Sequence, residues 1–184
     1  PVGGATDMVR GEPCAAMRAI ASLVRSSGSA LTHELARADT AVWRTVREEI
    51  ETGVLTEGRV ARDVVEALPE GGALVVSNSN PVRDLDTYVP ATRRTLRVLH
   101  QRGANGIDGL VSSAAGARSA IDAPLALLLG DLAFAHDLGG LAAARSVPGP
   151  LAIVVVQNGG GRIFEQLPVA RTTAPATLER FFVT

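Results

Sequence analysis

Two apolar runs joined by a helical pattern constrain the fold of this chain more than any other feature. Residues 125–129 form the first run and residues 151–156 the second. The stretch between them has apolar residues at helical spacing: Leu138, Leu141 and Ala142. Strands that are apolar throughout are typical of a parallel sheet covered on both faces. We therefore predict an α/β fold, with a mostly parallel sheet and helices on both faces.

Polar residues follow both of these predicted strands. Gly130 and Asp131 follow the first strand, and Asn158 precedes the glycines at 159–161 after the second. Because ligands bind beyond the carboxyl ends of parallel strands, we expect Asp131 and Asn158 to lie near each other at such a site. A carboxylate, an amide oxygen and a backbone carbonyl suit Mg²⁺. Glycines let the backbone adopt positive φ and approach a diphosphate closely. Each piece alone could equally be an ordinary turn.

The rest of the chain predicts further helices and strands around this unit. Residues 1–13 are typical of a loop or linker, and residues 171–184 receive no predicted element. Thr32 and Thr56 are the expected N-caps of two helices, and Val60, Val64, Val65 and Leu68 should face the core. The expected helices are 14–26, 32–52, 56–68 and 109–120, the expected strands are 73–76 and 96–99, and a short helical turn is expected at 163–167.

Composition excludes several classes of function. The formal net charge is −1, which offers no basic field for nucleic acid or an anionic membrane. No apolar run approaches the roughly 20 residues that span a bilayer, and the first residues do not resemble a signal peptide. The single cysteine, Cys14, excludes an internal disulfide. The absence of lysine excludes Schiff-base chemistry within this chain.

Four blocks of sequence together resemble one family of enzymes. Gly130-Asp131, followed later by Asn158, resembles the metal–diphosphate motif of thiamine diphosphate enzymes. The blocks at 77–84, 102–109, 130–138 and 160–164 are similar, in this order, to 2-succinyl-5-enolpyruvyl-6-hydroxy-3-cyclohexene-1-carboxylate (SEPHCHC) synthases of menaquinone biosynthesis. Leu132 stands where most thiamine diphosphate enzymes have glycine, and this departure also resembles SEPHCHC synthases. Gly159 stands where relatives often have asparagine, so the metal loop matches less closely there.

The resemblance implies a cofactor and a metal ion. Thiamine diphosphate would bind with Mg²⁺ or Mn²⁺, and the metal ligands would be Asp131, Asn158 and the Gly160 carbonyl. The residues that would contact the cofactor are Ile107, Gly130, Asp131, Leu132, Ala133, Asn158, Gly160 and Ile163. Ile107 would separate the two rings of the cofactor, although its spacing alone favours an ordinary core isoleucine.

The resemblance also implies substrates. A SEPHCHC synthase decarboxylates 2-oxoglutarate and adds the resulting succinyl carbanion to isochorismate, so several carboxylates need partners. Arg83 and Arg102 match positions that would bind them, because arginine binds carboxylates in bidentate fashion, and Ser79 would add a hydrogen bond. An apolar wall over the reacting carbon would consist of Ile163, Phe164 and Leu167. Any one of these residues could instead be a surface charge or a core contact.

The same resemblance predicts the domain organisation. Residues 1–54 would be a linker and the end of a middle domain, and residues 55–184 a thiamine diphosphate domain truncated at its C-terminus. We expect no catalytic residue in this chain, because most of its glutamates are on the N-terminal helices and Glu165 lies beside the substrate wall. The catalytic acid would come from the pyrimidine-binding domain of a second subunit in a cytoplasmic homodimer or homotetramer. The isolated chain would therefore be inactive.

Two alternatives remain open from the sequence. The chain could belong to another thiamine diphosphate decarboxylase or carboligase, such as an acetolactate-synthase-like enzyme, although the block at 79–84 is not typical of those. It could also be a noncatalytic, flavodoxin-like nucleotide-binding module. The absence of a Gly-x-Gly-x-x-Gly pattern after the strand at 73–76 argues against that alternative.

Overall fold

The computed structural model describes residues 10–24, 28–103 and 106–183, and it divides between Arg44 and Thr45 into two compact units. The first unit contains helix α1 (Pro13–Leu23) and most of helix α2 (Ala30–Thr52). Glu12 caps α1, because its carboxylate accepts hydrogen bonds from the backbone N–H groups of Cys14 and Ala15 at 2.9 and 2.7 Å.

Two predictions for these helices are wrong in detail. Helix α1 ends at Leu23, since Val24 has extended backbone, and residues 25–27 lie outside the described part. Helix α2 begins before Thr32, and Ser29 supplies the cap expected of that threonine. The Ser29 hydroxyl accepts a hydrogen bond from the Thr32 backbone N–H at 3.1 Å. Serine and threonine are both common N-cap residues, so the presence of Thr32 alone did not decide where the helix starts.

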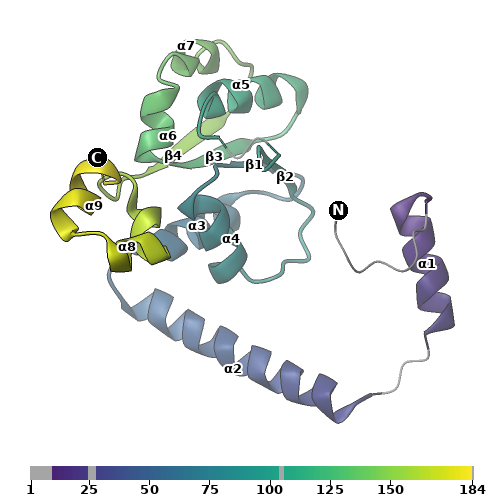
Figure 1. The fold of residues 1–184 in the computed structure, drawn as a ribbon. Coiled ribbons are helices and arrows are strands. Elements are labelled where there is room, and N and C mark those ends of the chain that lie inside the picture. The colour runs from purple at the N-terminus through teal and green to yellow at the C-terminus, as the bar shows by residue number, and fades with distance from the viewer. Residues whose placement is uncertain (1–9, 25–27, 104–105, 184) are drawn as a thin grey trace. The chain divides into compact units, whose positions relative to one another are not determined.

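A four-stranded parallel sheet forms the centre of the second unit (Figure 1). Its spatial order is β2 (Arg97–His100), β1 (Ala73–Val76), β3 (Leu125–Gly130) and β4 (Leu151–Val156). Ala73 is in register with Arg97 and Leu125, and Leu125 is in register with Leu151. All four carboxyl ends therefore meet at one edge of the sheet. The predicted α/β fold is confirmed.

Helices cover both faces of this sheet, as the apolar strands predicted. Successive side chains of a strand point to opposite faces. Leu125, Leu127 and Leu129 pack against α5 (Leu110–Ala120) and α6 (Asp131–His136). Ala126 and Leu128 pack instead on the side of α3 (Glu57–Ala67) and α4 (Asn80–Tyr88). Figure 1 shows α5, α6 and α7 on one side of the strands and α3 and α4 on the other.

Helix α3 forms and packs as its sequence indicates. The Thr56 hydroxyl caps the helix by accepting a hydrogen bond from the Arg59 N–H at 3.2 Å. Gly58 lies against the ring of Tyr88, and a Cβ atom at Gly58 would come within 2.5 Å of that ring. The missing side chain therefore lets α3 approach α4 closely. The residues predicted to face the core are buried or half-buried: Val60, Val64, Val65 and Leu68.

The helix predicted around Leu138 is broken into two. Helix α6 ends at His136, and α7 (Gly140–Ala144) begins after a turn that contains Leu138. Leu138 lies outside both helices and is 52% exposed, so the predicted helical pattern of the three apolar residues is interrupted, and of them only Leu141 packs against the core. Asp137 uses the turn to cap another helix, α5, by accepting hydrogen bonds from the Ser112 N–H and hydroxyl at 2.7 and 3.0 Å.

The C-terminal residues, for which the sequence predicted no element, pack beside the glycine loop. The expected turn forms as the 3₁₀ helix η1 (Arg162–Gln166), and α8 (Pro168–Thr172) and α9 (Pro175–Phe181) follow it. Phe182 then stacks obliquely on Phe164, with ring centroids 5.0 Å apart. Gly161 is in contact with the Phe182 backbone, where a Cβ atom would overlap the carbonyl group. None of the described helices has the length and apolar character needed to cross a membrane.

Candidate functional site

A cavity of about 520 Å³ opens where β1, β3 and β4 end. It collects residues from all four of the blocks identified in the sequence. The predicted site residues that line it are Ser79, Arg83, Arg102, Ile107, Gly130, Asp131, Leu132, Ala133, Asn158, Ile163, Phe164 and Leu167. Gly160 is buried beside it and bonds to one of the lining residues, Asp131. The fold thus gathers predicted site residues that are up to 88 positions apart in the sequence, from Ser79 to Leu167.

Asp131 ties the end of β3 to the glycine loop after β4. Its Oδ2 accepts a hydrogen bond from the Gly160 N–H and its Oδ1 one from the Leu132 N–H, both at 2.8 Å. Gly159, Gly160 and Gly161 have φ values of 84°, 77° and 30°. Residues that carry a side chain rarely adopt a positive φ, so the backbone of this loop depends on its glycines, as expected.

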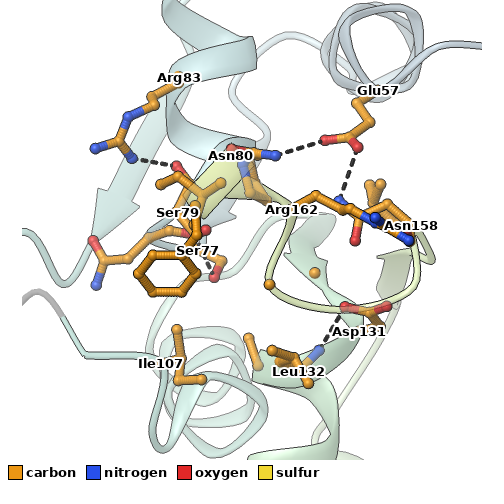
Figure 2. A pocket seen from close by; sticks show the side chains of 18 of the residues that line it. Glu57, Ser77, Ser79, Asn80, Arg83, Ile107, Asp131, Leu132, Asn158 and Arg162 are labelled. Atoms are coloured by element: carbon orange, nitrogen blue, oxygen red, sulfur yellow. Dashed lines mark hydrogen bonds between the residues drawn. The ribbon is translucent and has the colours of Figure 1, made fainter. Parts of the chain in front are cut away.

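Asn158 presents its amide in a fixed orientation. Its Nδ2 donates to Oε1 of Glu57 at 2.8 Å, so its amide oxygen is directed away from that carboxylate (Figure 2). The oxygens expected as metal ligands, those of Asp131, Asn158 and the Gly160 carbonyl, are of the chemical kind that Mg²⁺ or Mn²⁺ prefers. No cluster of three or more histidine, cysteine or acidic side chains able to hold a metal occurs in the described part of the chain. A cation here would therefore rely on this mixed set.

Ser79 has a backbone conformation that non-glycine residues rarely adopt. It precedes α4 with a φ of 73° and a ψ of −137°. Conformations of this kind cost of order 1–3 kcal/mol and cluster at functional sites. The Ser79 carbonyl also accepts a hydrogen bond from Nη1 of Arg83 at 2.6 Å. The strained residue thereby places the guanidinium of Arg83 at the rim of the cavity, as Figure 2 shows.

Arg102 and Ile107 are positioned through the buried Asn78. The Asn78 amide oxygen accepts from Nη1 of Arg102 at 3.4 Å, and its nitrogen donates to the Gly106 carbonyl at 2.5 Å. Ile107 is half-buried and packs against the core on the α5 side while also lining the cavity. Ile107 is therefore both a core residue and a residue of the cavity lining.

Helix η1 forms an apolar side of the cavity. Ile163 and Phe164 are half-buried there, and Leu167 is 42% exposed at the edge. Arg162, which the sequence did not single out, donates from Nε to the Asn158 carbonyl at 3.1 Å. This bond fastens η1 to the loop that carries Asn158.

Glu57 is a cavity residue that sequence reasoning missed. From the sequence, most glutamates are on the N-terminal helices and Glu57 has no place in the site, yet Glu57 lines the cavity from the start of α3. Its Oε2 accepts from Nδ2 of Asn80 at 3.3 Å, while Oε1 accepts from Asn158. An acidic residue after a capping threonine is ordinary in sequence, and its partner Asn158 is 101 residues away.

A second carboxyl group lies beside Glu57, behind the cavity. Burial of Asp84, followed by the effect of the Glu57 carboxylate, raises the pKa of Asp84 from its ordinary value of 3.8 to about 6. Both residues line a second cavity of about 670 Å³ on that side, and its other charged residues are Glu49, Arg162 and Glu165. Acidic side chains therefore outnumber basic ones around this second cavity.

The fold and the site define a class: an α/β domain with a cavity at the carboxyl edge of a parallel sheet, lined by a carboxylate, amides, arginines and an apolar side. No family model matches the chain. Curated relatives do match it, and those named here are all called SEPHCHC synthase. The relative from Sorangium cellulosum is 52% identical over 99% of this chain, and that from Myxococcus xanthus is 44% identical over 100%. The relative from Halobacterium salinarum is 39% identical over 96% of the chain.

The chain belongs to the family of SEPHCHC synthases, which confirms the resemblance of its four blocks. It spans only 31% of the length of the Sorangium relative and 32% of that from Myxococcus. The activity and substrates of the whole protein therefore remain matters for proposal.

Proposed function

We propose that this chain is the diphosphate- and cation-binding part of a SEPHCHC synthase that depends on thiamine diphosphate and acts in menaquinone biosynthesis. The observation that carries this proposal is that residues of all four sequence blocks line the same cavity. Family membership supports it, because the names of the relatives specify the product. Residues 55–184 would constitute this domain, with residues 1–54 as linker and end of a preceding domain, in a cytoplasmic protein.

The cation and the diphosphate would share the edge formed by β3 and β4. Asp131, Asn158 and the Gly160 carbonyl would hold Mg²⁺ or Mn²⁺, which would bridge to the diphosphate. The glycine loop would admit the phosphate oxygens close to the backbone, and Ile107 would support the cofactor from the side of the core. When bound, thiamine diphosphate would supply a nucleophilic carbon and an acceptor for the electron pair that stays behind when a 2-oxoacid loses CO₂.

The substrates would be 2-oxoglutarate and isochorismate. Arg83 and Arg102 would bind their carboxylates, and Ser79 would donate a hydrogen bond from the strained start of α4. Ile163, Phe164 and Leu167 would cover the reacting atoms and exclude water. We further propose that the acid acting on the pyrimidine ring comes from a pyrimidine-binding domain of a second subunit in a homodimer or homotetramer, and that these 184 residues alone are inactive.

An assay of the full-length protein tests this function. It should consume 2-oxoglutarate and isochorismate only when thiamine diphosphate and Mg²⁺ are present, and mass spectrometry should detect the SEPHCHC product. Pyruvate in place of 2-oxoglutarate serves as the discriminating control, because an acetolactate-synthase-like enzyme would use it. Turnover of pyruvate without turnover of 2-oxoglutarate would contradict the proposal.

A further inference from the structure

Glu57 joins the ends of two strands through one carboxylate. Its Oε1 accepts from Nδ2 of Asn158 at 2.8 Å, beyond β4, and its Oε2 accepts from Nδ2 of Asn80 at 3.3 Å, beyond β1. Figure 2 shows the carboxylate between the two amides, on the far side of Asn158 from Asp131. Each carboxylate oxygen thus receives an N–H from a different segment.

This arrangement determines which end of the Asn158 amide faces the cavity. An amide has an oxygen that can bind a cation and a nitrogen that cannot, and the two ends have nearly the same shape. A carboxylate accepts hydrogen bonds and does not donate them, so Glu57 selects the nitrogen of Asn158. The amide oxygen is then left for the side of the cavity that holds Asp131 and the glycine loop.

Helix α3 holds Glu57 in place for this contact. The Thr56 hydroxyl already caps the helix, so the Glu57 carboxylate is not needed at the Arg59 N–H. The start of a helix favours a negative side chain. The close contact between Gly58 and Tyr88 fixes the first turn of α3 against α4, which carries Asn80. Backbone packing and helix polarity both keep the carboxylate at the strand ends.

We propose that Glu57 is a positioning residue of the cation site, which orients the Asn158 amide so that its oxygen faces the metal ion. The inference rests on the proposed function, because it assumes that Asn158 is a ligand. Groups that orient metal ligands typically contribute tenfold to hundredfold to metal affinity. Glu57 itself would not touch the metal ion.

Electron paramagnetic resonance can measure the affinity of the full-length protein for Mn²⁺ in the presence of thiamine diphosphate. This measurement tests the role of Glu57 without relying on turnover. Glu57→Leu has a similar volume and accepts no hydrogen bond, so it should weaken Mn²⁺ binding about tenfold to hundredfold. Glu66→Gln, which removes an exposed carboxylate from the same helix, is the matched control and should leave binding unchanged. Wild-type affinity in Glu57→Leu would overturn the inference.

An exchange of donor and acceptor separates orientation from packing. Combining Glu57→Gln with Asn158→Asp lets the new amide donate to the new carboxylate and still accept from Asn80. This pair should recover Mn²⁺ affinity to within about threefold of wild type, well above Glu57→Gln alone. Combining Glu57→Leu with Asn158→Asp tests the same point without a partner at position 57: a carboxylate has an oxygen at either end and needs no neighbour to orient it, so this pair should recover part of the affinity lost in Glu57→Leu.

The outcomes distinguish this inference from the proposed function. If the wild-type protein binds no Mn²⁺ with thiamine diphosphate, the proposed cation site is wrong and the role of Glu57 falls with it. If wild type binds but the exchange pair binds no better than Glu57→Gln, only the role of Glu57 is overturned. Should Glu57→Leu fail to fold by circular dichroism, the comparison of Glu57→Gln with the exchange pair decides alone.

Discussion

The carboxylate of Asp131 accepts a hydrogen bond from the backbone N–H of Gly160 at 2.8 Å, which joins the loops that follow β3 and β4. The bond exists because these strands are neighbours in a parallel sheet, with Gly130 in register with Val156. It places the one carboxylate of the proposed donor set against the glycine loop. The cation and diphosphate site therefore depends on the order of the strands as well as on the residues themselves.

Substrate binding should depend on the two arginines at the rim of the cavity. Arg83→Ala and Arg102→Ala should each lose about 1.5–3 kcal/mol of charge-assisted bonding, a tenfold to hundredfold loss in kcat/KM. Steady-state kinetics with 2-oxoglutarate and isochorismate measure this loss, and the affinity for thiamine diphosphate should not change. Arg97→Ala, on the exposed strand β2, is the control. Unchanged kinetics for both substrates in both variants would refute the assignment.

The stability of the fold should depend on pH through Asp84. Its pKa is raised to about 6 in the folded protein, so the folded state binds the proton more tightly than the unfolded state. The resulting stabilisation is complete below about pH 4 and is lost as pH rises through 6. Asp84→Asn should therefore stabilise the protein at pH 8 relative to wild type, by about 1 kcal/mol after allowance for solvent screening.

Urea unfolding of wild type and Asp84→Asn at pH 4 and pH 8 measures that difference. The gain from the substitution should be present at pH 8 and absent at pH 4. Asp86→Asn, on an exposed position of the same helix, is the matched control. A gain of equal size at both pH values would show that Asp84 does not titrate as its surroundings indicate.

Arg94 should contribute to stability by closing the end of α3. Its guanidinium donates to the carbonyls of Val65, Glu66 and Leu68 at 3.0, 3.2 and 2.7 Å. The last carbonyls of a helix otherwise need water or another partner. Arg94→Ala should lower the free energy of unfolding by about 1–3 kcal/mol, measured by urea unfolding. The neighbouring Arg93→Ala should change it little, and an equal loss in both variants would argue against a specific cap.

The sequence predicted the sheet because continuous apolar runs that end in polar residues are typical of buried parallel strands. Residues 125–129 and 151–156 were recognisable since both faces of the sheet are covered, and the resemblance supplied the pocket residues. Leu138 was misplaced because α6 ends at His136, where Asp137 leaves the helical conformation and caps α5, and the helical spacing of the apolar residues does not register such a stop. Glu57 was missed because its contact with Asn158 spans 101 residues and arises only when α3 packs over the strand ends.

Calorimetric titration of thiamine diphosphate into the full-length protein, with and without Mg²⁺, tests the central claim most directly. Wild type should bind the cofactor in a metal-dependent manner, and Asp131→Ala should abolish that dependence because the only carboxylate of the donor set is lost. Asp131→Asn, which retains an oxygen for the Leu132 N–H, should bind weakly. Thermal unfolding should show that both variants remain folded. Unchanged, metal-dependent affinity for thiamine diphosphate in Asp131→Ala would contradict the account.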